Sequence, residues 1–321
     1  MPTARRPRRG SLQYWPRSRA AKSIPSVNWK IYSQKSIDST TLLGFIVYKA
    51  GMISVEAKDN TPHSMTKGKK IIVPATILEC PPAKIFSVRF YWNNQVAFET
   101  LIPSDKELKK LVKLPKQSTT FTFDIKKQYD DLRIIAYSVA KKTNIQKTPY
   151  LIELALSGSL DDKKKFIQEH IAKDISISEV FKKGSLVDVH GVTKGYGLSG
   201  PVKRFGIALK SHKSEKGVRR PGSLAPWHPS RVTFRAPMAG QLGLFTRIIY
   251  NLHVLSQGRI SEKNINPEHG FKNYGKINSS YIIVNGSVQG PPKRQLLLTA
   301  SFRPSKLQTK RKLELLEVLT K

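Results

Sequence analysis

Residues 194–235 constrain the fold of this chain most, because little of this stretch could lie inside a globular core. Lysines and arginines recur along it, and Glu215 is its only acidic residue. Glycines and prolines interrupt any regular element. Alone in water, such a segment repels itself and buries too little apolar surface to offset its conformational entropy. We therefore predict an extended, looped excursion that becomes ordered on a polyanionic partner.

The turn of the excursion falls near residues 225–229, where prolines on both sides of Trp227 and His228 stiffen the backbone. A tryptophan presented in this way can stack on a base or a ribose. The alternative is a Trp227 that folds back onto the protein core, the usual place for a lone tryptophan. The basic, glycine-rich surroundings favour the exposed position. His212 and His228 are candidate contacts as well, with plain solvent exposure as the alternative for each.

The overall charge points to a nucleic acid. Lysine and arginine number 56 against 22 acidic residues, which gives a formal charge of +34 and strong self-repulsion unless a polyanion neutralises it. An anionic membrane is the competing polyanion, but no apolar run has the length of a spanning helix. We expect a soluble, unsecreted chain. Cys80 is the only cysteine, which excludes an internal disulfide and fits a reducing cytoplasm.

The first 35 residues contain no acid and interleave tryptophans with arginines. Stacking and guanidinium contacts act together on RNA, so we interpret this segment as a nucleic-acid-binding arm. Its RRPRR run alone is equally typical of a solvated tail or a transport signal. Thirteen of the 22 acids lie between Glu99 and Asp188, so the middle of the chain is expected to face RNA less.

Runs rich in β-branched residues begin at Leu42 and predict strands. LLGFIVY and ISVEA are separated by KAGM, which we interpret as a turn, and IIVPATILEC follows a polar loop. FSVRFYW continues through Asn93 and Asn94 into QVAFETLI, and this pair tolerates the left-handed conformations of a tight hairpin. Pro74 within IIVPATI predicts an edge position or a bulge.

Between residues 103 and 180 the hydrophobic period becomes helical. Ser104 and Glu107 resemble a capping box before ELKKLVKL. Residues 129–142 carry acids at the start and lysines at the end, as the helix dipole prefers, and predict a second helix. A third helix is expected after Ser159, and YLIELAL at 150–156 predicts one more strand.

Four later runs predict strands again: LVDVHGVT, TRIIYNLHVLS, SYIIVNGSV and RQLLLTASF. Short strands on both sides of an insertion suggest a closed barrel. We therefore expect a mainly β fold with an α-containing insertion. The barrel core would comprise residues 41–99 and 181–303, interrupted by an α/β insertion at 100–180. The basic extensions would be an N-terminal arm at 1–40, the central loop at 194–235 and a tail at 304–321, where KLQTKRKLELLEVLTK predicts a short helix.

Gly195, Gly197 and Gly200 spell G-x-G-x-x-G after a predicted strand, which raises a dinucleotide site as an alternative. That mechanism needs a helix N-terminus for the pyrophosphate and an acid for the ribose. The residues that follow show no sustained helical apolar face. Glycines that let the backbone approach RNA phosphate would account for the same sequence pattern. The histidines show no zinc spacing, and no catalytic constellation can be assembled, so we expect no cofactor and no metal.

Several blocks carry a resemblance to a known family. They are GSLQYWPRSRA, YKAGM, KGKKIIVPATILECPPAKIFSVRFY, ISISEVFKKGSLVDVHGVTKGYGLSGPVKRFG, APWHPSRV and GFKNYGKINSSYIIVNGSVQGPPKR. In this order, from about residue 10 to residue 303, they resemble ribosomal protein L-three of the large subunit. The 100–180 insertion is similar to that of the archaeal and eukaryotic branch.

The resemblance implies a barrel of translation-factor type, with the arm and the central loop threading into large-subunit rRNA. It places Trp227 at a fingertip near the peptidyl-transferase centre. It implies a role in early subunit assembly and in aminoacyl-tRNA accommodation, without catalysis by the protein. The partners would be large-subunit rRNA and neighbouring large-subunit proteins in the cytoplasm, without a membrane and without homo-oligomers. DNA or chromatin binding is the runner-up function, and a nucleotide-dependent oxidoreductase is the enzyme alternative.

The residues expected to bind RNA are basic or aromatic, or are histidines of the excursion. They are Arg5, Arg6, Arg8, Arg9, Trp15, Arg17, Arg19, Lys194, Lys203, Arg204, Lys210, His212, Lys213, Arg219, Arg220, Trp227, His228, Arg231, Arg235, Lys293 and Arg294.

Overall fold

The structure is a computed structural model that describes residues 14–33, 41–102, 108–109, 111–114, 128–171 and 173–319. The chain divides into two compact units. Unit 1 comprises Met1–Ser23 and Val192–Arg247, and unit 2 comprises Ile24–Gly191 and Ile248–Lys321. Strands account for most of the regular structure, so the mainly β fold expected from the sequence is confirmed.

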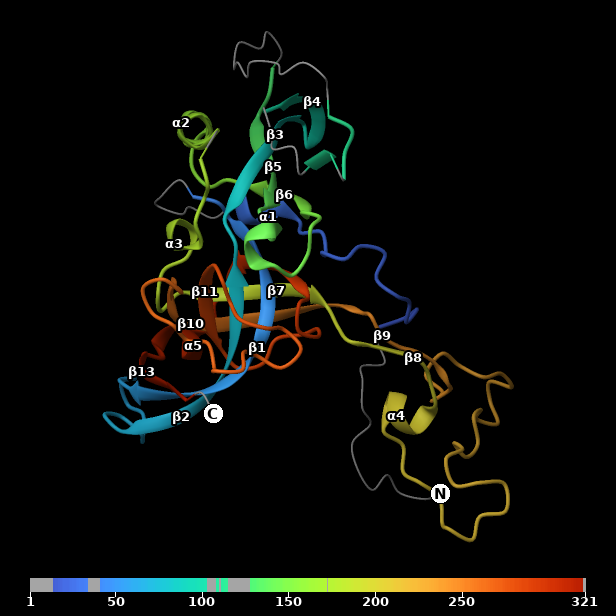
Figure 1. Ribbon diagram of the computed structural model, residues 1–321. Helices are drawn as coiled ribbons and strands as arrows, with labels where there is room; N and C mark the ends of the chain where they lie inside the picture. The colour runs from blue at the N-terminus through green and yellow to red at the C-terminus, as the bar shows by residue number, and fades with distance from the viewer. Residues whose placement is uncertain are drawn as a thin grey trace. The chain divides into compact units, whose positions relative to one another are not determined.

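The larger sheet has the strand order β12-β7-β10-β11-β2-β1-β13 (Figure 1). β1 also pairs with β12, from Gly44 opposite Thr299 to Tyr48 opposite Gln295. The pairing of β1 with β12 closes the run β12-β7-β10-β11-β2-β1 into a ring. β13 extends the sheet beside the second half of β1. The strands are β1 (Gly44–Asp59), β2 (Lys70–Cys80), β7 (Leu186–Val192), β10 (Thr246–Arg259), β11 (Ser280–Asn285), β12 (Gln295–Ala300) and β13 (Leu313–Leu319).

β1 corrects one expectation. The KAGM sequence is not a turn between two strands, because β1 runs through it without interruption. The pairing with β2 shifts register between Lys49 and Gly51, which marks a β-bulge. A bulge bends a strand without ending it, so a single strand can pair with β12 in its first half and with β13 in its second.

Pro74 lies where the prediction placed it. Its strand, β2, pairs with β11 only as far as Ala75 opposite Asn285, while its pairing with β1 continues to Lys70. The Pro74 carbonyl accepts from the backbone N–H of Gly286 at 2.8 Å. Pro74 therefore lies where the pairing of β2 with β11 ends. Its missing N–H does not interrupt the hydrogen bonding between the strands.

The smaller sheet of unit 2 has the order β4-β3-β5-β6. The hairpin expected at Asn93 and Asn94 is confirmed, since both residues have positive φ values of 49° and 64° and join β3 to β4. The helix expected after Ser159 is confirmed with its capping box, formed by Ser159 and Asp162. The elements here are β3 (Ala83–Trp92), β4 (Gln95–Leu101), β5 (Asp131–Ser138), the 3-10 helix Ala140–Thr143, β6 (Leu151–Ala155), α2 (Leu160–His170) and α3 (Ile177–Val180).

The helix expected at 129–142 is wrong. Asp131–Ser138 is strand β5, hydrogen-bonded to β3 on one side and to β6 on the other. Leu132, Ile134 and Ala136 are buried at every second position, which is the period of a strand. Asp131 does not cap a helix; its carboxylate pairs with Arg133 at 3.3 Å. The helix expected around Glu107 falls partly outside the described residues.

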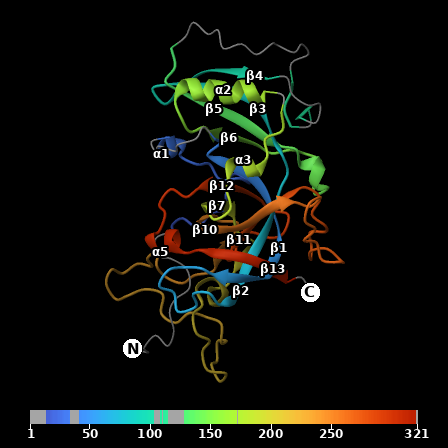
Figure 2. The ribbon, with the colours of Figure 1, turned by 90° about the vertical axis from the view of Figure 1, so that its left-hand side faces the viewer.

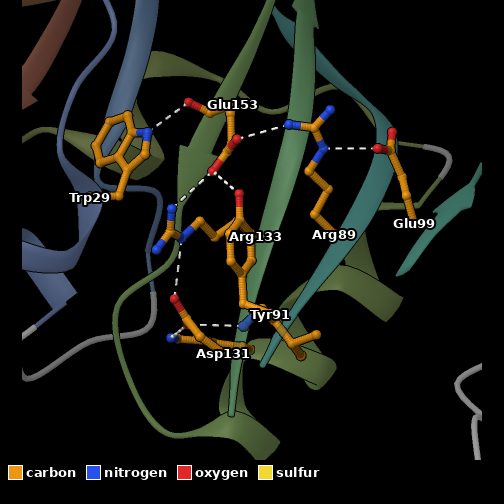
Figure 3. Close-up of polar contacts among 9 residues, drawn as sticks. Trp29, Arg89, Tyr91, Glu99, Asp131, Arg133 and Glu153 are labelled. Atoms are coloured by element: carbon orange, nitrogen blue, oxygen red, sulfur yellow. Dashed lines mark hydrogen bonds and ion pairs between the residues drawn. The ribbon is translucent and has the colours of Figure 1, made fainter. Parts of the chain in front are cut away.

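A polar network crosses the smaller sheet (Figure 3). The Glu153 carboxylate accepts from Arg89 Nη1 at 3.0 Å, from Arg133 Nη1 at 3.0 Å and from the Tyr91 hydroxyl at 2.7 Å. Burial raises the pKa of Tyr91 to about 12, and the Glu153 carboxylate acts in the same direction. Glu153, with Glu99 and Asp131 beside it, is therefore paired with the arginines of unit 2.

One apolar cluster joins the two sheets of unit 2. It includes Phe45 of β1, Ile134 of β5, Leu154 of β6 and Leu297 of β12, all at most 1% exposed. Figure 2 shows α2 lying along the smaller sheet. Trp29 of α1 (Trp29–Ser33) belongs to the same cluster and donates its indole N–H to the Glu153 carbonyl at 2.9 Å.

The C-terminal segment is only partly helical. The expected short helix exists as α5 (Lys306–Lys310), but Leu313–Leu319 forms strand β13. β13 pairs with β1 from Leu319 opposite Ser54 to Leu313 opposite Asp59. Alternating burial at the start of LELLEVL explains the strand, because Leu313 and Leu315 pack at every second position against an apolar cluster of unit 2.

Candidate nucleic-acid interface

Unit 1 is built around a two-stranded sheet in which β8 (Gly195–Ser199) pairs with β9 (Gly240–Gly243) in an antiparallel manner (Figure 1). α4 (Pro201–Phe205) follows β8 directly. The excursion therefore contains short regular elements at its base, which the sequence reasoning did not expect.

A close backbone approach holds the base of the excursion together. The backbone N–H of Leu244 donates to the Lys194 carbonyl at 3.2 Å. Thr193 and Phe245 exchange two hydrogen bonds, one from the Thr193 N–H at 3.0 Å and one to the Thr193 Oγ1 at 3.1 Å. Gly243 has φ of +81°, and a Cβ there would lie 1.9 Å from the Lys194 carbonyl oxygen. Only glycine fits this position without moving the backbone.

Arginine and aromatic side chains from the N-terminal segment and from the excursion interleave in unit 1. The Arg17 guanidinium lies 5.4 Å from the Trp15 ring and 4.9 Å from the Phe205 ring. The Arg204 guanidinium lies 5.2 Å from Phe205 and 6.0 Å from Trp15. We call these four residues the arginine–aromatic cluster. Nearby, the Ala20 N–H donates to the Leu244 carbonyl at 2.7 Å, so the two chain segments also share a backbone bond.

Arg204 is the buried centre of this cluster. Its Nε donates to the Gln241 carbonyl at 3.1 Å and its Nη1 donates to the Met238 carbonyl at 2.9 Å. Burial lowers its pKa, although a guanidinium stays charged at physiological pH. Among the described residues, no carboxylate lies within ion-pair distance of Arg204. The two carbonyl dipoles and the ring faces are therefore its main stabilising contacts.

The middle of the excursion matches the prediction. Residues 206–239 contain neither helix nor strand. Trp227 is 89% exposed, so the folded-back alternative is wrong in this structure. Its ring meets His228 edge-on, with the centroids 6.4 Å apart. A freely accessible aromatic face is what base stacking requires.

The structure separates the expected RNA-binding residues into several groups. Trp15 and Arg17 are half-buried and Arg204 is buried, all three within the cluster. Lys293 and Arg294 belong to unit 2, and Arg5, Arg6, Arg8 and Arg9 lie outside the described residues. The remaining residues are exposed in unit 1: Arg19, Lys194, Lys203, Lys210, His212, Lys213, Arg219, Arg220, Trp227, His228, Arg231 and Arg235.

Sequence reasoning missed several exposed aromatic residues of unit 1. Tyr196 is 51% exposed with the Lys203 Nζ 4.3 Å from its ring, and Phe234 is 80% exposed. Arg247 lies 4.2 Å from the ring of Tyr14. The available signal was the recurrence of aromatics among basic residues, which had been used for the arm but not for the excursion.

The G-x-G-x-x-G sequence does not form a dinucleotide site. It lies in β8, whose partner β9 is antiparallel, and the helix that follows has five residues. A dinucleotide fold needs a parallel βαβ unit with a full helix behind the glycines. Gly197, at φ +61° with open space where a Cβ would stand, serves the conformation of β8 instead.

Other chemistries receive no support from the described ranges. Within them, no group of three or more histidine, cysteine, aspartate or glutamate side chains could hold a metal ion. No helix there is long and apolar enough to cross a membrane. Cys80 is buried, and burial raises the pKa of its thiol well above the ordinary value. The exposed basic surface of unit 1, with its accessible aromatic rings, is that of a nucleic-acid-binding protein.

Comparison with known proteins specifies the class. The model of the family "Ribosomal protein L3" matches residues 1–320. Large ribosomal subunit protein uL3 of Methanocaldococcus jannaschii is 37% identical over 313 residues, which is 93% of this chain and 92% of the relative. The uL3 proteins of Methanococcus aeolicus and Archaeoglobus fulgidus are 37% and 35% identical, covering 93% and 94% of this chain and 92% and 93% of their own.

The chain therefore belongs to the ribosomal protein L3 family. It is a structural constituent of the large ribosomal subunit and not an enzyme. It is located in the cytoplasm as part of the ribosome. The resemblance found in the sequence blocks is confirmed, and the oxidoreductase and chromatin alternatives give way to it.

Proposed function

We propose that unit 1 is the main rRNA-binding surface of this protein. The observation that carries the proposal is its charge. Glu215 is the only acid in the whole of unit 1, while the lysines and arginines between Lys194 and Arg235 are exposed with the exception of Arg204. Exposed cations on a loop without regular structure can follow a phosphate backbone, and released counterions supply the binding free energy.

Within unit 1, the residues divide into contacts and supports. The exposed cations bind phosphate, and Trp227 with His228 contacts bases or riboses at the fingertip, near the peptidyl-transferase centre. Trp15, Arg17 and Arg204 act by positioning, because their side chains are engaged in the arginine–aromatic cluster. Lys293 and Arg294 of unit 2, and the arginines of the first ten residues, provide further phosphate contacts.

The ring of strands in unit 2 is proposed as the closed barrel of the family, with the smaller sheet as the body of the insertion. In this proposal the core comprises residues 41–82 and 181–303, the insertion residues 83–180, and the basic extensions residues 1–40 and 194–235, while β13 of the 304–321 tail adds to the core sheet. β3 and β4 belong to the smaller sheet by their hydrogen bonds, which moves the start of that body back to Ala83. Neighbouring large-subunit proteins would contact unit 2, and the protein would act as a single copy during early subunit assembly.

Salt dependence tests the rRNA-binding surface. The purified chain should bind structured large-subunit rRNA fragments with an affinity that falls by about 10³-fold or more between 50 and 200 mM salt, as expected for six or more phosphate contacts. Arg219→Ala, at an exposed cation, should reduce the slope of log K against log salt by about 0.9. Equal binding to duplex DNA of the same length, or a slope near zero, would refute the proposal.

The fingertip has its own test. Trp227→Ala removes an 89% exposed side chain, so the variant should fold and enter large subunits with the unmodified sedimentation profile. Those subunits should accommodate aminoacyl-tRNA more slowly than subunits with the natural chain. Leu307→Ala, which truncates an 82% exposed leucine of unit 2, is the matched control. Identical accommodation rates for both variants would remove Trp227 from the proposed role.

A further inference from the structure

A groove lies on the outer face of β2, β1 and β13, on a part of unit 2 that rRNA binding by unit 1 does not use. Its volume is about 1000 Å³. It is lined by Met52, Ile53, Ser54 and Ile72, by residues 266–272 and by Leu319, and we call it the outer groove.

The floor of the outer groove is aliphatic and open to solvent. Ser54 of β1 pairs with Pro74 of β2 and with Leu319 of β13, which places neighbouring positions of three strands side by side. Because side chains alternate between the faces of a sheet, Met52 and Ile72 share the face of Ser54. Met52 is 51% exposed, Ile72 71% and Leu319 39%. An exposed aliphatic floor of this kind is typical of a contact surface.

The wall of the outer groove is held in place before any partner arrives. Phe271 packs against Gly51, where a Cβ would lie 3.1 Å from its ring. Asn266 and Ile277 exchange two hydrogen bonds, at 3.0 and 2.8 Å. The Tyr274 hydroxyl donates to the buried Glu79 carboxylate. A preformed wall means that little ordering entropy is lost on binding.

One end of the groove carries two carboxylates that face each other. Glu56 of β1 stands directly opposite Glu317 of β13. Lys70 pairs with Glu56 at 3.0 Å, but within the described residues Glu317 has no cation at ion-pair distance. Like charges facing each other across two strands are destabilising. A cation supplied by a partner would relieve this repulsion.

We propose that the outer groove binds a segment of another protein of the large subunit, aliphatic in its middle and with a lysine or arginine that meets Glu317. This inference rests on the membership of the large subunit established above. RNA fits the surface poorly. Glu56 and Glu317 at one end repel phosphate, and Met52, Ile72 and Leu319 of the floor offer no ring for stacking. The wall offers a nucleic acid one lysine, Lys272, and one histidine, His269.

Cross-linking inside purified large subunits tests the proposal. A photoreactive p-benzoylphenylalanine replaces Ile72 in one chain and, as the control, the 82% exposed Leu307 of α5 in another. After irradiation, mass spectrometry should map the Ile72 cross-link to one peptide of another ribosomal protein that contains aliphatic residues and a lysine or arginine. Glu317→Lys should lower this yield several-fold while leaving the Leu307 product unchanged. The substitution does not threaten the fold, because a lysine there would face Glu56.

Oxidation of Met52 provides a second readout that needs no substitution. Peroxide should convert Met52 to its sulfoxide several-fold more slowly in the subunit than in the free chain, since the partner covers it. A cross-link to rRNA, to a second copy of this chain or to a peptide without a basic residue would overturn the proposal, as would equal oxidation rates. The sedimentation profile shows separately whether the chain enters subunits, so a negative result refutes the groove and not the rRNA-binding function.

Discussion

Replacing Arg204 with alanine should loosen unit 1 while leaving unit 2 intact. Arg204 is buried, donates to the Gln241 and Met238 carbonyls at 3.1 and 2.9 Å, and lies over the rings of Phe205 and Trp15. Alanine removes all four contacts and leaves two carbonyls of the β9 region without their donor. The surrounding chain has little other packing to compensate, because residues 206–239 form no helix or strand.

The magnitude follows from these contacts. Each hydrogen bond from a charged donor contributes about 1.5–3 kcal/mol, so the pair contributes roughly 3–6 kcal/mol. The ring contacts add about 0.5–1 kcal/mol each where they are partly solvated. Because Arg204 also suffers desolvation, we take the lower end and expect a loss of about 3–4 kcal/mol, which is about 2–3 decades in the local opening equilibrium.

Hydrogen exchange with peptide resolution measures this loss directly. Amide protection at the base of unit 1, where Thr193 and Leu244 donate to backbone carbonyls, should fall by about 10²–10³-fold in Arg204→Ala. Protection in the β1 and β12 peptides of unit 2 should stay unchanged. Arg219→Ala removes the same charge from an exposed position and is the control. If both variants keep the natural protection at Thr193 and Leu244, the supporting role assigned to Arg204 is wrong.

Three further predictions concern single features of the fold. Gly243→Ala should destabilise the β8–β9 pair by more than the roughly 1–3 kcal/mol of backbone strain, because its Cβ would clash with the Lys194 carbonyl. Gly217→Ala is the control in the same exchange experiment, because at φ +88° with open space it has the backbone strain without the clash. Glu153→Gln should lower the urea-unfolding free energy by about 1–3 kcal/mol, since three donors lose a charged acceptor that is 23% exposed. The control Glu169→Gln, on the surface, should change this free energy by less than about 0.5 kcal/mol. Burial lowers the pKa of His190 from 6.5 to about 4. Its stabilising contribution is therefore complete above pH 6.5 and is lost as the pH falls towards 4, because the unfolded chain then binds a proton more readily than the folded chain. At pH 4 the natural chain should have lost about 3 kcal/mol more of its unfolding free energy than His190→Asn, and parallel pH profiles would contradict this.

The sequence predicted most strands because their physical signal is local. The β7 and β11 segments are short runs rich in valine or isoleucine between turn residues, and the Asn93-Asn94 pair supplied the conformations that a hairpin needs. The helix predicted at 129–142 is wrong for an equally physical reason. Ile135 and Tyr137 are apolar as well, so the alternation of Leu132, Ile134 and Ala136 was hidden. Charges at the ends then matched a helix dipole that does not exist there.

The arginine–aromatic cluster could not be predicted in the same way. Arg204 and Arg219 are the same residue type in the same basic stretch, and only tertiary packing buries one and exposes the other. Trp15 and Trp227 form a similar pair, since both stand next to prolines among arginines. Contacts between residues 15–17 and 204–205 depend on two segments that are distant in sequence, and a local pattern contains no information on such a pairing.

The cluster also links the fold of unit 1 to its proposed ligand. Arg17 and Arg204 approach the same two rings with like charges, and unit 1 contains one acid to offset its cations. Self-repulsion therefore opposes the folded form, and any polyanion that binds it adds stability by mass action. Substitutions in the cluster should weaken rRNA binding by shifting the folding equilibrium, with the salt slope retained. Substitutions at exposed cations should lower the slope and leave the fold unchanged. Measuring both the salt slope of rRNA binding and the amide protection therefore distinguishes the two kinds of residue, even where the variants bind rRNA with equal affinity.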